Sequence, residues 1–448
     1  MRPDSPEAFD LAQRHARDLA RAALERWRAE HGGCSVGAPY GLSDEHEVVR
    51  RSAERFAERW ISPVAEEIHA DDALISEELL AAMADLGAFG VSIPEEHGGC
   101  YAGHRAMVVL TEELSRASLG AGGSVITRPE ICAKALLHGG THEQQARWLP
   151  AIAAGEVMVA VAVTEPGAGS DVAALSLRAE ADDAGGYRLF GEKTWCTFAG
   201  RADLLLLLAR TGPVEAGARG LTMLLVDKPT TRGREFDFER GGGRMQGHAI
   251  RTVGYRGMRS FSVSFDGWPV PADQRIGDEG QGFGLCMHGF AGGRLQTAAR
   301  AVGVMEAALR ATAVQVEHRK VFGRPLAEHP LPAARLAEMA ERVQSGRQLT
   351  YEVADRMDAR DPDAAVAAAA VKLVTCSDAE WVTRQAMQLH GGLGYAEECV
   401  VSRLWQDARV LTIFEGAEEV LALRVIARHL LQEQGPTPAS PETASGPR

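Results

Sequence analysis

Four short segments combine residue types that could hold a ligand and move a proton. The first is TEPGAGSD at residues 164–171, where small residues let a ligand approach the backbone and Thr164 and Ser170 offer hydroxyl groups. Backbone N–H groups in such a loop can bind a phosphate or a ring carbonyl. A plain β-turn after an apolar strand explains the same residues, and the loop alone favours neither interpretation.

Two further segments place aromatic or flexible residues beside polar groups. In KTWCT at 193–197, Trp195 could stack on a planar ring while Thr197 bonds to a ring heteroatom. A buried tryptophan in a sheet is the alternative. In QLHGGLGY at 388–395, glycines follow a long helical segment, and an ordinary helix C-terminus explains them equally well.

The fourth segment, LTIFEGA at 411–417, carries a single carboxylate between an apolar run and a glycine. If Glu415 is buried, its carboxylate can serve as a general base. The alternative is an exposed glutamate at the start of a helix, because glutamate is mostly exposed in proteins.

The sequence patterns that predict helices and strands change along the chain, and these elements must position the four segments. Helix-forming composition fills residues 1–30, and capping signals at Ser43 and Asp44 begin a second helical stretch. Short β-type runs start near residue 158, and FSVSF at 261–265 alternates with a period of two. From about 280, apolar residues step by three and four, as in Val302, Met305, Leu309, Thr312 and Val316 and then Val371, Val374, Trp381 and Leu389.

These signals predict a multi-domain α+β protein: an N-terminal all-α domain, a middle β-sandwich or barrel domain and a C-terminal four-helix bundle. The predicted boundaries are an N-terminal helical extension and loop at 1–42, the helical domain at 43–157, the β domain at 158–275, the bundle at 276–432 and a disordered tail at 433–448. Helices, strands and helices in separate blocks disfavour a Rossmann fold, in which strands and helices alternate.

Composition limits the partners and the compartment. The 448 residues contain 48 Lys+Arg and 61 Asp+Glu, which gives a formal charge of −13 and argues against nucleic acid or an anionic membrane as a partner. No apolar run is long enough to span a bilayer and no signal peptide is evident. Seven cysteines without metal-ligand spacing predict reduced thiols, no metal site and a cytoplasmic location.

Together the four segments resemble the acyl-CoA dehydrogenase family over about residues 43–432. TEPGAGSD and QLHGGLGYAEECVVSRLWQD are similar to two separate signatures of that family. The resemblance implies FAD as cofactor, α,β-dehydrogenation of an acyl-CoA thioester, a bundle that forms homotetramers and electron-transfer flavoprotein as electron acceptor. In this reaction a glutamate removes the α-proton and the β-hydrogen passes as hydride to flavin N5.

The resemblance also implies roles for single residues. Glu415, in Phe-Glu-Gly-Ala, matches the base of most members, whereas some branched-chain members carry it where this chain has Gly293. Implied FAD contacts are Thr164, Ser170, Trp195 and Thr197, with Arg319, Phe322, Gln388 and Gly392 reaching the cofactor of a neighbouring subunit. Implied substrate contacts are Ser170, Gly416 and Arg294, the last near the nucleotide end of CoA.

Four residues depart from the family pattern: Val321, Pro330, Ala417 and Glu419. They replace hydrogen-bonding groups near the FAD nucleotide or after the base, so weaker FAD binding is expected. Each lost hydrogen bond removes about 0.5–1.5 kcal/mol.

Two stretches bear on the substrate: GHAIRTVGYRGM at 247–258 and GRLQTAAR at 293–300 resemble the members that convert (2S)-methylsuccinyl-CoA to mesaconyl-CoA. A generic short-chain or branched-chain acyl-CoA dehydrogenase is equally favoured. A methylsuccinyl group would need a cation or several donors at the closed end of the pocket, and the sequence identifies none, since His248 and Arg251 lie in the β domain at an unknown depth. An acyl-CoA oxidase and a non-catalytic FAD-binding assembly protein are further alternatives, although Glu415 argues against the latter.

Overall fold

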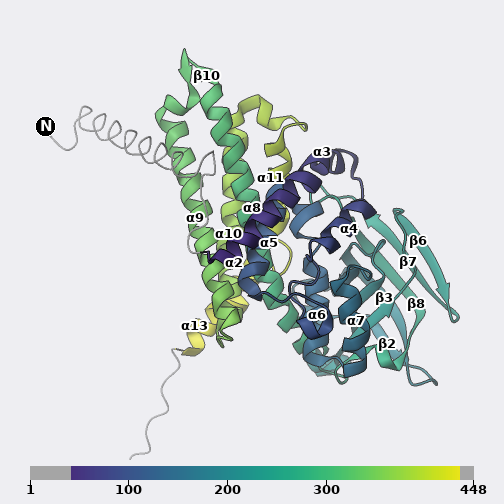
Figure 1. The fold of residues 1–448 in the computed structure, drawn as a ribbon. Coiled ribbons are helices and arrows are strands. Elements are labelled where there is room, and N and C mark those ends of the chain that lie inside the picture. Colours follow the sequence, from purple (N-terminus) through teal and green to yellow (C-terminus); the bar gives the residue numbers. More distant parts are fainter. Residues whose placement is uncertain (1–41, 434–448) are drawn as a thin grey trace, which may run out of the picture.

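The structure is a computed structural model that describes residues 42–433. The predicted helical extension up to residue 41 and the predicted tail from residue 434 onward lie outside the described residues. Within them the order of helices, strands and helices is confirmed, and the three blocks lie side by side (Figure 1).

The N-terminal block is helical. Ser43 caps its first helix, because the hydroxyl oxygen accepts the backbone N–H of His46. The helices are α2 (Asp44–Phe56), α3 (Ser62–Asp71), α4 (Glu77–Asp85), α5 (Gly103–Ala117), α6 (Thr127–Gly139) and α7 (His142–Ala153), with a π-helical turn at Ala57–Ile61 between α2 and α3.

The middle block is a nine-stranded sheet in the order β6-β7-β8-β3-β2-β4-β5-β9, with β1 added parallel to β4. In β8, Phe261, Val263 and Phe265 are buried, as the alternation predicted. The strands are β1 (Val159–Ala162), β2 (Arg178–Ala181), β3 (Tyr187–Thr197), β4 (Leu204–Arg210), β5 (Leu221–Asp227), β6 (Glu235–Arg240), β7 (Gly243–Ile250), β8 (Ser260–Val270) and β9 (Arg275–Ile276).

The C-terminal block is again helical, and α8 buries all five apolar-face residues predicted between Val302 and Val316. Val374 in α10 is instead 44% exposed, so the predicted inward face is wrong at that position. The elements are α8 (Gly282–His318), α9 (Pro330–Asp358), α10 (Ala364–His390), α11 (Val400–Leu411), α12 (Glu418–Val420) and α13 (Ala427–Glu433), with a hairpin of β10 (Lys320–Val321) and β11 (Arg324–Pro325).

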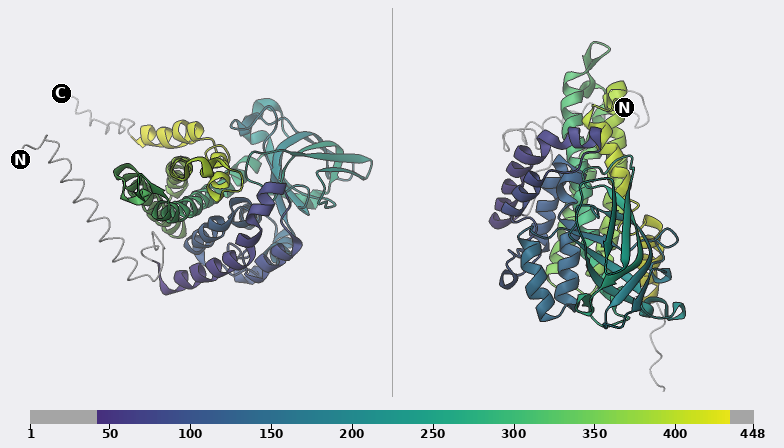
Figure 2. Two further views of the ribbon diagram at one scale, coloured as in Figure 1. Left: turned by 90° about the horizontal axis from the view of Figure 1, so that it is seen from above. Right: turned by 90° about the vertical axis from the view of Figure 1, so that its right-hand side faces the viewer.

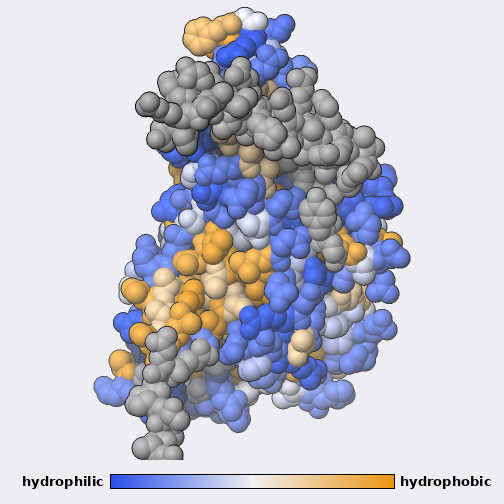
Figure 3. Space-filling model, turned by 90° about the vertical axis from the view of Figure 1, so that its left-hand side faces the viewer, coloured by the Kyte–Doolittle hydropathy of each residue, from blue (hydrophilic) through white to orange (hydrophobic). Residues whose placement is uncertain are grey.

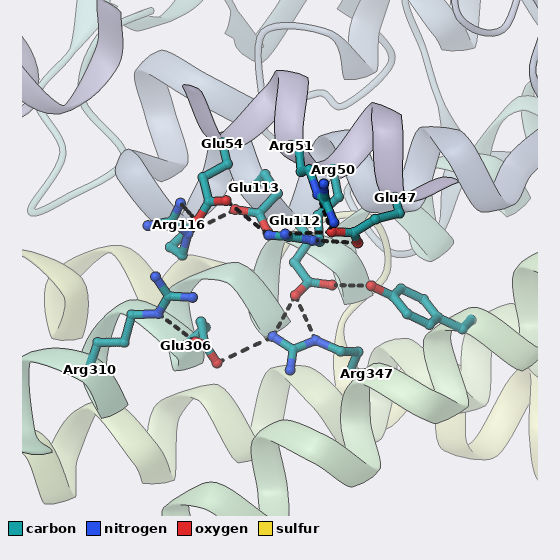
Figure 4. A network of polar contacts seen from close by, with 11 residues as sticks. Glu47, Arg50, Arg51, Glu54, Glu112, Glu113, Arg116, Glu306, Arg310 and Arg347 are labelled. Carbon is teal, nitrogen blue, oxygen red and sulfur yellow. Dashed lines mark hydrogen bonds and ion pairs between the residues drawn. The ribbon is translucent and has the colours of Figure 1, made fainter. Parts of the chain in front are cut away.

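The N-terminal helices lie along one side of the molecule (Figure 2), where they pack against both the bundle and the sheet. One apolar cluster packs α2 and α5 against α8, and a second packs α6 and α7 against β4 and β5. A charged network reinforces the first contact, because Arg347 of α9 bonds to Glu112 of α5 and to Glu306 of α8 (Figure 4). These contacts fix α6, α8 and the turn after α11 around one interior region.

Candidate active site

Glu415 occupies a strained turn after α11. Its φ is 54° and that of Gly416 is 104°, so two successive residues adopt the left-handed conformation. Such a conformation costs about 1–3 kcal/mol in a non-glycine residue and persists only where the surroundings enforce it. The Glu415 Oε2 atom is buried and has no hydrogen-bond partner, so its lone pairs are available to a substrate proton.

Gly293 of α8 faces this carboxylate. A Cβ atom at Gly293 would lie 3.2 Å from Glu415 Oε2 and 3.4 Å from Ile131 Cδ1 of α6. Position 293 is therefore beside Glu415 but supplies no carboxylate of its own. Of positions 293 and 415, where members of the family resembled carry the base, only Glu415 has a carboxylate that can accept a proton.

Arg294 follows Gly293 on α8 and is largely buried. Burial lowers the pKa of the Arg294 guanidinium, and the charges of Glu415 and Cys286 oppose that shift. The Nε atom of Arg294 has no hydrogen-bond partner. The structure thus places Arg294 within electrostatic reach of Glu415, and its contact with the nucleotide end of CoA stays a prediction.

Lys372 of α10 forms a hydrogen bond to the turn that carries Glu415. Its side chain is fully buried, and Nζ donates a 2.8 Å hydrogen bond to the carbonyl oxygen of Gly416. Burial lowers the pKa of Lys372, while Cys376, Glu418 and Glu415 raise it. Sequence reasoning missed this residue, because a lysine in an Ala-rich helix carries no signal of burial.

The second group of predicted residues gathers where β1 and β3 end. The backbone N–H of Thr194 donates to the carbonyl of Thr164 at 2.8 Å, which joins the TEPGAGSD loop to the Trp195 segment. The loop is also a tight turn, because the backbones of Glu165 and Ala168 bond to each other. The N–H groups of Glu165 and Ala168 are therefore occupied, whereas no partner of the Thr164 or Ser170 hydroxyl is found within residues 42–433.

A β-bulge between Lys193 and Cys196 redirects Trp195 out of the sheet. The indole is 55% exposed with φ at 58°, so the alternative of a buried core tryptophan is wrong. Thr197 beside it is buried, and its hydroxyl shares a 2.9 Å hydrogen bond with that of Ser260. An exposed indole next to a hydroxyl is the arrangement that the stacking interpretation required.

A buried ion pair joins the TEPGAGSD loop to β3, and the sequence analysis did not predict it. Lys193 Nζ lies 2.8 Å from Glu165 Oε1 and also donates to the carbonyl of Val163. Glu165 accepts three more hydrogen bonds, from Ser176 N, Ser176 Oγ and Leu177 N. The pair ties the glycine-rich loop to β3 just before Trp195, and a charged residue inside a strand was its only sequence signal.

These residues fit the isoalloxazine end of a flavin. Trp195 offers an exposed aromatic face, and a Cβ atom at Gly167 would meet nothing within 4 Å, which leaves room along the loop. Thr164, Ser170 and Thr197 would supply hydroxyl groups to the ring and the ribitol. These hydroxyl groups can donate to and accept from the polar edge of a planar ring.

The remaining predicted cofactor residues lie at the other end of α8. Arg319 ends that helix, 26 residues after Gly293, which corresponds to about 39 Å along the axis. Phe322 in the hairpin is 95% exposed, and Gln388 and Gly392 are exposed at the end of α10. Within one chain, Arg319 therefore lies far along α8 from Gly293 and the facing Glu415.

Of the four departures from the family pattern, Pro330 has a local explanation. It is the first residue of α9, a position where the missing N–H of proline costs nothing. The effect of all four on FAD affinity stays a prediction.

The residues first considered as the cation for a substrate carboxylate do not fit that role. His248 and Arg251 are exposed in the β domain, so neither lines the closed end of a pocket. The structure instead buries Arg128 of α6 and Arg300 of α8 near Glu415.

Comparison with known protein families accounts for nearly all of the described chain. Residues 43–156, 160–267 and 280–431 match the N-terminal, middle and C-terminal domains of acyl-CoA dehydrogenases. The chain belongs to the acyl-CoA dehydrogenase family. Members of this family are FAD-dependent oxidoreductases, so the cofactor of this acyl-CoA dehydrogenase is FAD.

Individual relatives resemble the chain along most of its length. The (2S)-methylsuccinyl-CoA dehydrogenase of Cereibacter sphaeroides is 43% identical over 418 residues, which cover 92% of this chain and 74% of that one. The structure of butyryl-CoA dehydrogenase from Megasphaera elsdenii superimposes with a TM-score of 0.81 at 29% identity, over 88% of this chain and all of that one. A chain in the structure of the electron transferring flavoprotein of Acidaminococcus fermentans gives a TM-score of 0.81 at 28% identity, with the same two shares.

No helix in residues 42–433 is long and apolar enough to cross a membrane.

Proposed function

We propose that Glu415 removes the α-proton of a bound acyl-CoA thioester. The observation that carries this proposal is the buried, unpartnered Oε2 atom in a turn that faces Gly293. When bound, FAD supplies the acceptor for the β-hydride. The chain's own part is to hold the carboxylate ready, to position the thioester beside Ser170, Arg294 and Gly416, and to stabilise enolate charge through the N–H of Glu415.

For the substrate we propose (2S)-methylsuccinyl-CoA, with mesaconyl-CoA as product. The proposal is supported by 43% identity to an enzyme of that name and by the buried guanidinium groups near Glu415, which an apolar acyl group would not need. The second candidate is a short-chain acyl-CoA such as butyryl-CoA, which is favoured by similarity to a butyryl-CoA dehydrogenase structure.

We further propose a homotetramer in which Arg319, Phe322, Gln388 and Gly392 contact the FAD of a neighbouring subunit. The distance of Arg319 from Gly293 along α8 and the exposure of Phe322, Gln388 and Gly392 support contacts in trans. Apolar residues also gather on the outer side of the bundle (Figure 3), and Leu423, Leu430 and Leu431 are among the exposed apolar side chains of the last helices.

Electron-transfer flavoprotein is the proposed acceptor, and its support is the similarity to a chain solved in such a system. A cytoplasmic location is proposed as well, because the cysteines characterised within residues 42–433 are free thiols. An oxidase would instead pass electrons to oxygen.

The test is a flavin-bleaching screen of the purified holoenzyme without oxygen, against methylsuccinyl-, butyryl-, isobutyryl- and 2-methylbutyryl-CoA. We expect rapid bleaching, with the highest kcat/KM for methylsuccinyl-CoA. A higher kcat/KM for butyryl-CoA would select the second candidate. A bound flavin that no thioester bleaches would instead indicate an assembly protein. Re-oxidation by oxygen as fast as by electron-transfer flavoprotein would indicate an oxidase.

A further inference from the structure

Arg210 is a buried cation at the end of β4 that bonds to backbone carbonyl groups of two segments. The residue is 5% exposed, and it forms no ion pair within residues 42–433. Its Nε and Nη2 atoms donate to the carbonyl oxygens of Leu175 and Ala173 at 2.8 and 2.7 Å. Its Nη1 atom donates to those of Pro213 and Gly217 at 3.3 and 3.2 Å. Arg210 therefore joins the segment that follows the TEPGAGSD loop to the segment that follows β4.

The segment after β4 has a backbone that accommodates this guanidinium. Gly217 has φ 55° and ψ −126°, a conformation that glycine adopts far more readily than other residues, and its carbonyl group is one of the acceptors. A Cβ atom at Gly220 would lie 2.7 Å from Arg210 Nη1, so a larger residue there would push the guanidinium away. The N–H groups of Thr211 and Gly212 both donate to the carbonyl of Gly220 at 3.1 Å, which closes the segment into a turn. The turn therefore anchors the side chain.

Segment 172–177 is also held by Glu165. The Glu165 carboxylate accepts the backbone N–H groups of Ser176 and Leu177 at 2.7 and 2.9 Å, while Arg210 donates to two carbonyl groups of the same segment. Hydrogen bonds with a charged partner are stronger than those between neutral groups. Glu165 and Arg210 therefore fix the course of this segment, the first through its N–H groups and the second through its carbonyl groups.

Ser170 lies between two flanks that these charged residues hold. The flank before it is the tight turn of the TEPGAGSD loop, which the Lys193–Glu165 ion pair ties to β3. The flank after it is segment 172–177, whose carbonyl groups bond to Arg210. Ser170 itself is exposed, so the two flanks determine where its hydroxyl group lies. Loss of the guanidinium would loosen the second flank and leave the first tied to β3.

We propose that Arg210 is a positioning residue for thioester binding: by holding segment 172–177 to the turn after β4, it fixes the place at which Ser170 meets the acyl-CoA. This inference rests on the proposed function, in which the thioester lies beside Ser170. Arg210 acts through that segment, because its own hydrogen bonds go to the backbone. An arginine is required because its planar fork donates in several fixed directions at once, whereas a lysine ammonium is a single point charge.

The experiment compares Arg210→Met with Lys228→Met in the holoenzyme. Lys228 follows β5 at the opposite end of the β4–β5 pair, is 6% exposed and also donates to backbone carbonyl groups. For Arg210→Met we expect KM for the acyl-CoA that bleaches the wild type fastest to rise by about 10-fold or more, with kcat within about threefold, because lost ground-state binding raises KM and leaves kcat unchanged. Lys228→Met should lose similar stability in urea but keep KM. An unchanged KM in Arg210→Met would overturn the positioning role.

Further variants separate positioning from charge and from general loosening of the loop. Arg210→Lys keeps the charge but not the fork, so KM should stay raised; a return to the wild-type KM would overturn the proposal. Gly220→Ala pushes the guanidinium away without removing it and should raise KM as well, so it decides the question by the same measurement if Arg210→Met does not fold. Lys193→Met frees the first flank and should release FAD, whereas Arg210→Met should retain it. Equal loss of FAD from both variants would contradict a role in thioester binding.

Binding distinguishes failure of this role from failure of the proposed reaction. The Kd values of crotonyl-CoA and mesaconyl-CoA, read from flavin difference spectra without turnover, should rise by about 10-fold in Arg210→Met for each ligand that the wild type binds. A wild type that a thioester bleaches, with equal Kd values in both proteins, overturns the positioning role alone. A wild type that no thioester bleaches overturns dehydrogenation, and the Kd values still judge Arg210. If the wild type binds neither ligand, the positioning role is overturned too.

Discussion

Replacing Lys372 with methionine should separate the support of the catalytic turn from general stability. The change keeps much of the side-chain volume but removes the donor to the Gly416 carbonyl. A hydrogen bond with a charged partner contributes about 1.5–3 kcal/mol, and the variant no longer has to bury an ammonium group. Since these effects oppose each other, we expect the free energy of unfolding to fall by only about 1–2 kcal/mol.

The effect on catalysis should be larger than that modest loss suggests. Glu415 and Gly416 hold φ angles of 54° and 104°, and the Lys372 bond is one of the contacts that enforce this turn. A relaxed turn would shift the carboxylate, and misplacement by about 1 Å can slow a reaction by about 100-fold. We therefore expect kcat to fall by about 10- to 100-fold with little change in KM.

The assay is anaerobic stopped-flow bleaching of the flavin, alongside urea unfolding of the same samples. Lys228→Met is the control, because Lys228 is also a buried lysine bound to backbone carbonyls, those of Gly200, Ala202 and Pro229. That variant should lose stability but keep kcat. A normal kcat in Lys372→Met, with the same stability loss as the control, would show that Lys372 is structural only.

Three further changes have defined outcomes. Glu415→Gln should retain FAD and thioester binding but lose turnover by at least about 10²–10⁴-fold, because an amide cannot accept the α-proton; near-normal bleaching rates would place the base elsewhere. Lys193→Met leaves Glu165 buried without its cation, so thermal unfolding should show a loss of about 3–5 kcal/mol, and FAD should dissociate more readily; an unchanged melting temperature would contradict this role of the ion pair. Hydrogen bonds from Arg50, and then from Arg51, lower the pKa of Glu47 to about 2 from 4.5. Because this pKa is depressed in the folded chain, Glu47 stabilises it above about pH 4.5, and that contribution disappears as the pH falls through about 2. The stability deficit of Glu47→Gln should therefore be constant near neutrality and shrink below about pH 4.5, as followed by urea unfolding; a deficit independent of pH would argue against the ion pairs.

The sequence alone determined the features that depend on neighbouring residues. The period-two pattern of FSVSF placed Phe261, Val263 and Phe265 on the buried face of β8, and Ser43 marked the start of α2. Two signatures indicated the family, and the resemblance implied Glu415 as the proposed base. Each of these features depends on residues that are close together in the sequence. A repeating pattern, a capping residue or a motif therefore predicts it without knowledge of the fold.

Tertiary structure decided what surrounds the base. Lys372 reaches Gly416 across 44 positions, Arg128 reaches Tyr255 across 127 and Arg300 reaches Ser124 across 176. Helix α6, which carries Arg128, is buried on most sides, so it shows no amphipathic pattern that would separate a core face from a ligand face. In the sequence, a lysine or arginine that will be buried cannot be distinguished from one that stays on the surface. The desolvation that sets it apart exists only after the helices pack.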